Sequence, residues 1–307
     1  MSTTAAEPFA HPALFYRGAA EYLAETVPFV WSGLAAGEPV AIAVPGGNLR
    51  LLRRELGADA DRVRLLDMTE AGRNPGRIIP GVLREFADTH AGRPVRIIGE
   101  PIWAQRSAVE YPACAQHEAL INLAFTGRDV TILCPYDVGE LTPDVLADAE
   151  ATHPVVIDGA GRRASTAYAP GEIVARYNRP LPVPDDVAEL PDTTDLAAAR
   201  ALARAHAVAA GLTADQAADA EVVVTELLAN SIEHGSGTGT VRLWTEHGSF
   251  VCEVHDGGTL TDPLAGRRPA TPAQPRGRGL LLVNHLADLV RLHTGEHGTT
   301  FRVYFGA

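Results

Sequence analysis

The chain has no lysine: all 26 basic side chains among its 307 residues are arginine. Lysine holds phosphate in a P-loop and forms Schiff bases, so both kinds of chemistry are excluded. Its three cysteines, Cys114, Cys134 and Cys252, are far apart and odd in number, which predicts no disulfide framework. No apolar run is long enough to cross a bilayer, and the N-terminus has no signal-peptide pattern. We therefore expect a cytoplasmic protein without a membrane partner.

Basic charge is also scarce, since the formal net charge is -12. A nucleic-acid-binding protein with this balance would need a local basic face. The densest basic group is Arg267, Arg268, Arg276 and Arg278, in a loop rich in glycine and proline. We therefore expect no direct contact with nucleic acid.

The first half of the chain alternates short apolar runs with amphipathic helical patterns. Strands that are apolar throughout and separated by helices indicate a mostly parallel sheet covered on both faces. The expected strands are Pro39–Val44, Arg62–Met68, Pro94–Ile98, Val130–Cys134 and Pro154–Asp158. Expected helices include Leu49–Leu56 and Gly81–His90.

A proline-rich segment separates this half from the next. Proline fixes the backbone and removes a hydrogen-bond donor, so the four prolines between positions 180 and 191 predict a linker. We place the first domain at residues 9–179, the linker at 180–192 and the second domain at 193–307.

The second half predicts two helices, a hairpin, a loop, a helix and a strand. The helices are Asp195–Ala210 and one from the capping box of Thr213 and Gln216 to about Gly235. A hairpin turns at His247–Gly248, a helix covers Gly279–Leu289, and Phe301–Phe305 alternates as a last strand. This order favours an α+β domain with helices on one face of an antiparallel or mixed sheet.

The second of these helices carries Glu226 and Asn230 one turn apart. An amide oxygen suits Mg²⁺, and a carboxylate can accept a proton from a hydroxyl nucleophile. Judged by this spacing alone, the two residues are better explained as part of a solvent-exposed polar helix face than as a functional site. The neighbouring motifs change that balance.

Three further motifs follow in order along the chain. Asp256 ends a strand beside Gly257 and Gly258, where a carboxylate can accept a hydrogen bond from an exocyclic amine. Glycines and arginines at 276–279 open a helix whose free N–H groups suit phosphate. Residues 298–300, Gly-Thr-Thr, open the last strand.

Together these motifs resemble the GHKL ATPases, a family that includes gyrase, heat-shock chaperone ATPases, histidine kinases and MutL. Residues 225–231 are similar to its N box, 256–258 to its first glycine box, and 276–280 to its second. The compact Gly-Arg-Gly-Leu directly before a helix is most similar to anti-sigma-factor serine kinases. The resemblance covers residues 193–307 and implies the ATP-binding α+β sandwich called the Bergerat fold.

The resemblance implies a role for each matching residue. Glu226 would be the catalytic general base and Asn230 the Mg²⁺ ligand. ATP would be bound by Asp256, Gly258, Gly277, Arg278, Gly279 and Thr300. Of these, Asp256 would hold the adenine amine and Thr300 would lie near the base. Arg276 and Arg278 would offset phosphate charge, with loop solubility as the open alternative.

One position departs from the family pattern. The first glycine box is usually D-x-G-x-G, and Leu260 stands where its second glycine is expected. This substitution predicts weaker nucleotide binding. The loop from Leu260 to Arg276 is rich in proline and alanine, which predicts a lid that moves without ligand.

The first half is similar to the MEDS sensory domain, on five short strings: His11–Tyr16, Gly37–Pro39, Gly99–Trp103, Cys134–Asp137 and Thr152–Pro154. That resemblance implies a RecA-like fold without a phosphate loop, and a small-molecule ligand of unknown identity. Pro45-Gly46-Gly47-Asn48 stands in the place of a P-loop and reads as a tight turn between strand and helix.

Candidates for a sensory pocket are Glu100, Trp103, Tyr136 and Asp137, because they follow expected strand ends, with packing as the alternative for the two aromatic residues. A metal site is a second possibility: Cys114 and His117 have C-x₂-H spacing, and His11, Cys134 and His153 could converge. Structural zinc sites usually have closer ligand pairs, so we expect buried cysteines and hydrogen-bonded histidines instead.

These features predict a signalling regulator in which a sensory domain controls a Mg·ATP-dependent serine/threonine protein kinase of the anti-sigma type. Its partner would be an anti-sigma-factor antagonist or a sigma factor, and a homodimer is an open possibility. The alternative is a nucleotide-binding module that sequesters such a partner without catalysis. A simple ATPase without a protein substrate is a third hypothesis.

Overall fold

The computed structural model describes residues 9–270 and 277–306, which form two compact units. The first unit comprises residues 1–73 and 78–177, and the second comprises 74–77 and 178–307. Each unit has its own hydrophobic core. No helix in the described ranges is long and apolar enough to span a membrane.

The first unit contains a seven-stranded sheet in the order β3-β2-β4-β5-β1-β6-β7. All its pairings are parallel except that of β6 with β7, which closes one edge as a hairpin. The strands are β1 (Pro12–Tyr16), β2 (Val40–Val44), β3 (Arg64–Asp67), β4 (Val95–Gly99), β5 (Val130–Asp137), β6 (Val155–Asp158) and β7 (Gly161–Ala164).

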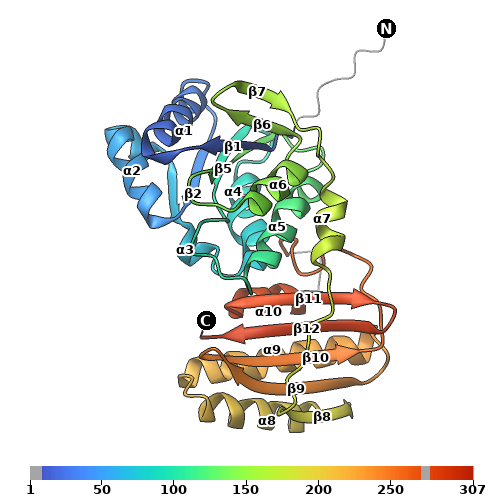
Figure 1. Cartoon of the computed structure of the whole chain (residues 1–307). Helices are drawn as coiled ribbons and strands as arrows, with labels where there is room; N and C mark the ends of the chain where they lie inside the picture. The colour runs from blue at the N-terminus through green and yellow to red at the C-terminus, as the bar shows by residue number, and fades with distance from the viewer. Residues whose placement is uncertain (1–8, 271–276, 307) are drawn as a thin grey trace. The chain divides into compact units, whose positions relative to one another are not determined.

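Helices cover both faces of this sheet, with α1 and α2 on one side and α4, α5 and α6 on the other (Figure 1). Buried apolar residues such as Ile42, Ile97, Ile98 and Ile132 fill the strands, as expected for a sheet covered on both faces. The helices are α1 (Gly18–Ala35), α2 (Gly46–Leu56), α3 (Met68–Ala71), α4 (Glu85–Thr89), α5 (Tyr111–Ala124), α6 (Pro143–Thr152) and α7 (Pro170–Tyr177). Short 3-10 helices cover Gly57–Arg62 and Pro75–Arg77, and a π-helical segment covers Ile79–Arg84.

The predicted mostly parallel fold is confirmed, and all five expected strands are present within a few residues. Two strands were missed. β1 has only five residues and begins with Pro12, yet it lies between β5 and β6 inside the sheet. β7 is exposed along its whole length and carries no apolar alternation, so its sequence gives no strand signal.

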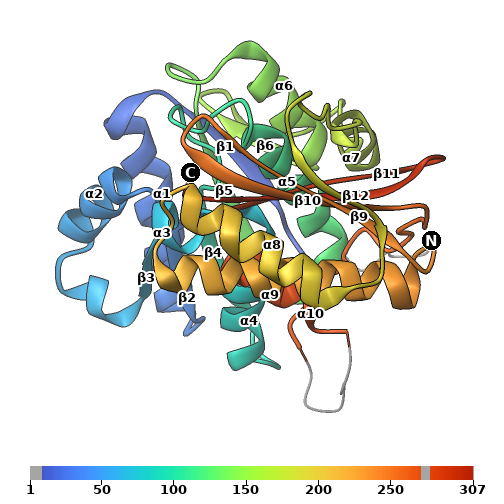
Figure 2. The same ribbon diagram turned by 90° about the horizontal axis from the view of Figure 1, so that it is seen from below.

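The second unit has a five-stranded antiparallel sheet in the order β11-β12-β10-β9-β8. Three helices supply the apolar side chains that pack against it, and Figure 2 shows α8 and α9 running side by side. The elements are β8 (Ala188–Thr193), α8 (Leu196–Ala209), α9 (Ala214–His234), β9 (Gly239–Glu246), β10 (Ser249–Asp256), α10 (Gly279–Leu286), β11 (Leu289–Gly295) and β12 (Gly298–Phe305).

Local signals explain the ends of these elements. Asp195 caps α8, and the predicted capping box of Thr213 and Gln216 begins α9. The β9–β10 turn places His247 and Gly248 at positive φ, as a two-residue hairpin requires. The α+β sandwich expected from the sequence is confirmed.

One expectation about this unit was wrong, and another segment carries more structure than expected. The last helix ends at Leu286 instead of Leu289, because Ala287 is extended and Leu289 begins β11. The predicted helix was therefore too long by three residues, and its last residue belongs to a strand. The end of the segment expected as a linker, residues 188–192, belongs to β8, the edge strand of the sheet, and Pro191 falls at a register shift, where an edge tolerates proline.

Candidate functional site

The candidate site of the second unit is built on α9, which brings its side chains to the end of β10. Ser231 donates from Oγ to Asp256 Oδ2 over 2.8 Å, and the Gly258 N–H donates to Asp256 Oδ1 over 2.7 Å. The Asp256 carboxylate is therefore held in one orientation by a hydroxyl and a backbone amide, and each oxygen retains a further lone pair.

Glycines allow the backbone to approach this carboxylate closely. A Cβ at Gly258 would lie 2.6 Å from Gly235 Cα and 2.8 Å from Asp256 Oδ1, and a Cβ at Gly235 would lie 2.4 Å from the same oxygen. A side chain at either position would therefore force the backbone or the Asp256 carboxylate to move. Gly258 thus lies beside Asp256 as expected, and Gly235 and Ser231 are members of the site that the sequence analysis missed.

Glu226 and Asn230 lie beside the beginning of α10. A Cβ at Gly279 would come within 2.4 Å of Glu226 Oε2 and 3.6 Å of Asn230 Nδ2. The backbone at the N-terminus of α10 is therefore in close contact with the side chains of Glu226 and Asn230. The structure brings together Glu226, Asn230 and Gly279, while Gly277 and Arg278 are exposed just before the helix. Arg276 lies outside the described residues.

The Asn230 amide supports a ligand at this position. Its Nδ2 is buried and has no hydrogen-bond partner among the described residues. Either end of an amide can be the oxygen, since the hydrogen-bond network decides the assignment. A buried amide end without a protein partner can therefore turn its oxygen to an external group, which is the donor that a hard cation prefers.

Thr300 is not where the resemblance implied. In the pairing of β10 with β12, Asp256 lies opposite Thr299 and His255 lies opposite Thr300. Because side chains alternate along a strand, Thr299 shares the face of Asp256 and Thr300 points to the other face. Thr300 Oγ1 is 3.0 Å from His255 Nδ1, whereas Thr299 donates to the Gly258 carbonyl over 2.9 Å. Thr299 is thus the threonine next to Asp256.

Leu260 is tied to the same cluster. Its backbone N–H donates to the hydroxyls of Thr294 and Thr299, over 3.0 and 3.2 Å. The described part of the expected lid also packs: Leu264 is buried, and the Gly266 carbonyl accepts from Asn284 Nδ2 over 3.0 Å. Residues 261–270 are therefore anchored to α10, and 271–276 lie outside the described residues.

The first unit has a separate polar cluster at the carboxyl ends of its strands. Asn48, at the start of α2, donates to both oxygens of Glu100 over 3.0 and 2.9 Å, and the Tyr16 hydroxyl donates over 3.4 Å. Burial raises the pKa of Glu100 to about 8, because water is excluded from its carboxylate. This edge of an open α/β sheet is where ligands bind.

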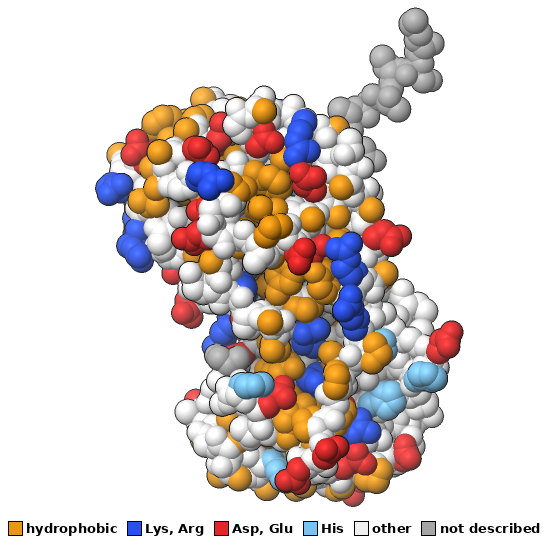
Figure 3. All heavy atoms as spheres, in the orientation of Figure 1, with side chains coloured by type: hydrophobic (Ala, Val, Ile, Leu, Met, Phe, Trp, Pro, Cys, Tyr) orange, Lys and Arg blue, Asp and Glu red, His pale blue; other side chains and the backbone are white. Residues whose placement is uncertain are grey.

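The four predicted pocket residues do not all belong to this cluster. The Arg106 guanidinium stacks on Trp103, with its Cζ 3.9 Å from the centre of the indole ring. Tyr136 is fully buried beside His153. Asp137 accepts from the Gly139 N–H and is close enough to raise the pKa of Glu100 further. Acidic and basic side chains are interspersed with apolar ones over the face of this unit in Figure 3.

Comparison with protein families gives two matches. Residues 10–154 match the MEDS family, described as the methanogen/methylotroph DcmR sensory domain. Residues 190–305 match the histidine kinase-like ATPase domain. A comparison with curated proteins gives no match.

Among solved structures, the RsbU and RsbW domains of a Mycobacterium tuberculosis protein are 20% identical to this chain. The match covers 39% of this chain and 32% of that one, with a TM-score of 0.30, so it carries no argument about function. Apart from residues 74–77, the two family matches lie in different units, and they agree with the two folds described above. The chain carries a MEDS sensory domain followed by a histidine kinase-like ATPase domain.

Proposed function

We propose that this protein is a cytoplasmic signalling regulator whose second unit is a Mg·ATP-dependent serine/threonine kinase of the anti-sigma-factor type, controlled by its MEDS domain. The observation that carries the proposal is the convergence of Glu226, Asn230 and Gly279 at the start of α10. It supports a site that takes a charged phosphate ligand at a helix N-terminus.

Each residue has a role in this proposal. Asp256 accepts a hydrogen bond from the adenine amine, with Thr299 beside it and the Gly258 backbone against the base. Asn230 would hold Mg²⁺ through its amide oxygen, and the ion would supply positive charge to offset that of the phosphates. Glu226 accepts the proton of the attacking serine or threonine hydroxyl. Gly277, Arg278 and Gly279 lie over the phosphates.

The partner is a regulatory protein such as an anti-sigma-factor antagonist or a sigma factor. A small molecule held at the MEDS domain would control the kinase, and Glu100 with Asn48 is our candidate for its contact. Two chains pairing as a homodimer is part of the same proposal. No membrane or nucleic acid takes part.

A second candidate function is a nucleotide-binding module that sequesters its partner without catalysis. The observation in its favour is Leu260, whose N–H is bonded to Thr294 and Thr299. A glycine could donate the same bonds, but the Leu260 side chain narrows the backbone conformations open to the strand-to-lid segment, where the family's glycine leaves them wide. A stable nucleotide complex without turnover fits that restraint.

Phosphotransfer separates the two functions. Glu226→Gln keeps the size of the side chain and removes its basicity, so a kinase should transfer phosphate about a hundredfold more slowly and still bind ATP. The assay follows labelled γ-phosphate from ATP to serine or threonine on purified anti-sigma-factor antagonists. Glu233→Gln is the control, since Glu233 is on the same helix and 62% of its side chain is exposed.

Transfer by the wild type and the control, but not by Glu226→Gln, supports the kinase. ATP binding without transfer to any partner, equal in all three proteins, supports sequestration. Release of free phosphate with no protein substrate would instead identify a simple ATPase.

A further inference from the structure

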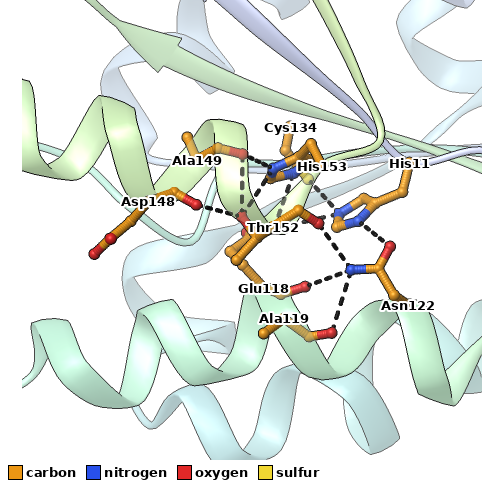
Figure 4. Close-up of polar contacts among 9 residues, drawn as sticks. All are labelled: His11, Glu118, Ala119, Asn122, Cys134, Asp148, Ala149, Thr152 and His153. Atoms are coloured by element: carbon orange, nitrogen blue, oxygen red, sulfur yellow. Dashed lines mark hydrogen bonds and ion pairs between the residues drawn. The ribbon is translucent and has the colours of Figure 1, made fainter. Parts of the chain in front are cut away.

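Four side chains that can ligate a metal converge in the core of the first unit. They are His11, just before β1, Glu118 on α5, Cys134 on β5 and His153, just after α6 (Figure 4). One ligand atom from each lies within 4.8 Å of all the others, and none of the four residues is more than 1% exposed. The sequence analysis expected buried cysteine and hydrogen-bonded histidine here, and did not include Glu118.

Three of the six distances among these atoms are close to the edges of a small coordination polyhedron, and all six are within 4.8 Å. His11 Nε2 is 3.3 Å from Glu118 Oε2 and 3.4 Å from Cys134 Sγ, and His153 Nε2 is 3.2 Å from the same Glu118 oxygen. Zinc bonds of about 2.0–2.3 Å in a tetrahedron put neighbouring ligand atoms roughly 3.3–3.8 Å apart. The cluster therefore already has nearly the spacing that a bound ion would impose.

Both imidazoles are held by their other nitrogen. His153 Nδ1 is 2.8 Å from the Ala149 carbonyl oxygen, which can only accept, so Nδ1 carries the proton. His11 Nδ1 is 3.2 Å from Asn122 Oδ1, and the Asn122 amide is oriented because its Nδ2 donates to the Thr152 carbonyl over 2.8 Å. The neutral form of each ring then turns the bare lone pair of Nε2 into the cluster, as in metal sites with a second layer of hydrogen bonds.

The lone pair of His153 Nε2 faces the Glu118 carboxylate, which can only accept, and that of His11 Nε2 has the weak S–H donor of Cys134 at 3.4 Å. Neither oxygen of Glu118 nor Nε2 of His153 has a hydrogen-bond partner among the described residues, although the two groups are 3.2 Å apart. A cation between the four atoms satisfies all of them at once.

We propose that His11, Glu118, Cys134 and His153 bind one divalent transition-metal ion, best fitted by Zn²⁺, as a closed structural site within the MEDS domain. One thiolate, two imidazoles and one carboxylate are ligands that zinc accepts. Cys114 and His117, the pair with C-x₂-H spacing, are not members of this cluster. Binding would join α5 to the segments before β1 and β6 and to β5, and would release the thiol proton to solvent.

The test uses the full-length chain without an affinity tag, purified from zinc-supplemented cells without chelator. We expect about one zinc per chain by mass spectrometry of metals, and X-ray absorption should show one sulfur at about 2.3 Å with nitrogen or oxygen ligands at about 2.0 Å. Protein refolded with Co²⁺ should show the visible bands of a tetrahedral site and a thiolate charge-transfer band.

Cys134→Ser should lose that charge-transfer band and Cys114→Ser, its matched control, should keep it, since Cys114 is an equally buried thiol outside the cluster. The absorption measurement needs only the wild type, so a variant that fails to fold does not decide the question. Wild-type protein with no stoichiometric metal and no cobalt spectrum would overturn the proposal. The four side chains would then form a hydrogen-bonded cluster without a metal. A metal shell without sulfur, or bands unchanged in folded Cys134→Ser, would overturn it too.

Discussion

At the scale of single residues, the Glu100 carboxyl is the clearest titratable feature of the first unit. It is 3% exposed, and its pKa is raised by burial to about 8 from an ordinary value of 4.5. In the unfolded chain it ionises near its ordinary value. Between these two values the folded state holds a proton that the unfolded state has lost, so stability falls as pH rises.

Glu100→Gln is therefore expected to differ little from the wild type at pH 4 and to become the more stable protein above pH 8. Glutamine resembles the protonated carboxyl and does not ionise. Urea unfolding of both proteins between pH 4 and 9 measures the difference. A difference that stays constant with pH would show that the buried carboxyl does not titrate in this range.

The glycine next to Asp256 gives a second prediction at this scale. A Cβ at Gly258 meets the backbone of Gly235 at 2.6 Å, whereas a Cβ at Gly257 meets only the Ser236 side chain, at 3.3 Å. We expect Gly258→Ala to cost about 1–3 kcal/mol of stability and to weaken ATP binding, because backbone must move. Gly257→Ala is the control and should change both much less. Equal thermal melting and equal affinity in the two variants would refute the argument.

At the scale of elements, a buried ion-pair network joins three strands of the second sheet. Arg302 on β12 donates to Glu253 Oε2 from Nε and Nη2, over 2.8 and 2.6 Å, and Arg242 on β9 donates to Glu253 Oε1 over 3.0 Å. Arg302 also donates to the carbonyls of Leu181 and Pro182, over 3.1 and 2.9 Å. This guanidinium thus holds part of the segment expected as a linker against the sheet.

Glu253→Ala would leave Arg302 buried without its carboxylate, and we expect a loss of about 3–5 kcal/mol. Glu189→Ala is the matched control: Glu189 pairs with the same Arg242 at the surface, with 38% of its side chain exposed, so its loss should cost about 1 kcal/mol or less. Chemical unfolding of both variants measures the contrast. Similar losses would contradict the role given to burial.

The elements also show what could be predicted. Elements whose ends carry a clear sequence signal, such as α9 with its capping box, were predicted to within a residue or two. β11 was missed because its first residue, Leu289, continues the apolar spacing of the helix that begins at Gly279, and the pairing with β12 makes it a strand residue instead. Thr299 and Thr300 are neighbours of the same type, so only strand register decides which one faces Asp256.

Convergence of distant residues was the least predictable feature. Glu118 is separated by 107 positions from His11 (118 − 11), and no local spacing marks it as a partner. The sheet order puts β1 between β5 and β6, which brings His11 beside Cys134 and His153. Three members were candidates from the sequence, but because β1 was missed nothing fixed their convergence, and Glu118 was not recognised as the fourth.

At the scale of the whole molecule, the chain has two units with separate cores, and the proposed nucleotide site uses only residues of the second. Calorimetry should therefore show Mg·ATP raising the melting temperature of one transition. If the Asp256 carboxylate acts only on the nucleotide, both units of Asp256→Asn remain folded. This variant is then the control, in which Mg·ATP should not raise the melting temperature.

The most direct test is the affinity for Mg·ATP by isothermal titration calorimetry, for the wild type, Asp256→Asn and Asp186→Asn. Asp186 is an exposed acid of the proline-rich segment and serves as control. We predict binding by the wild type and the control, and a roughly 10–100-fold loss for Asp256→Asn, because a charged acceptor contributes about 1.5–3 kcal/mol. No heat of binding from the folded wild type at millimolar Mg·ATP would contradict the account.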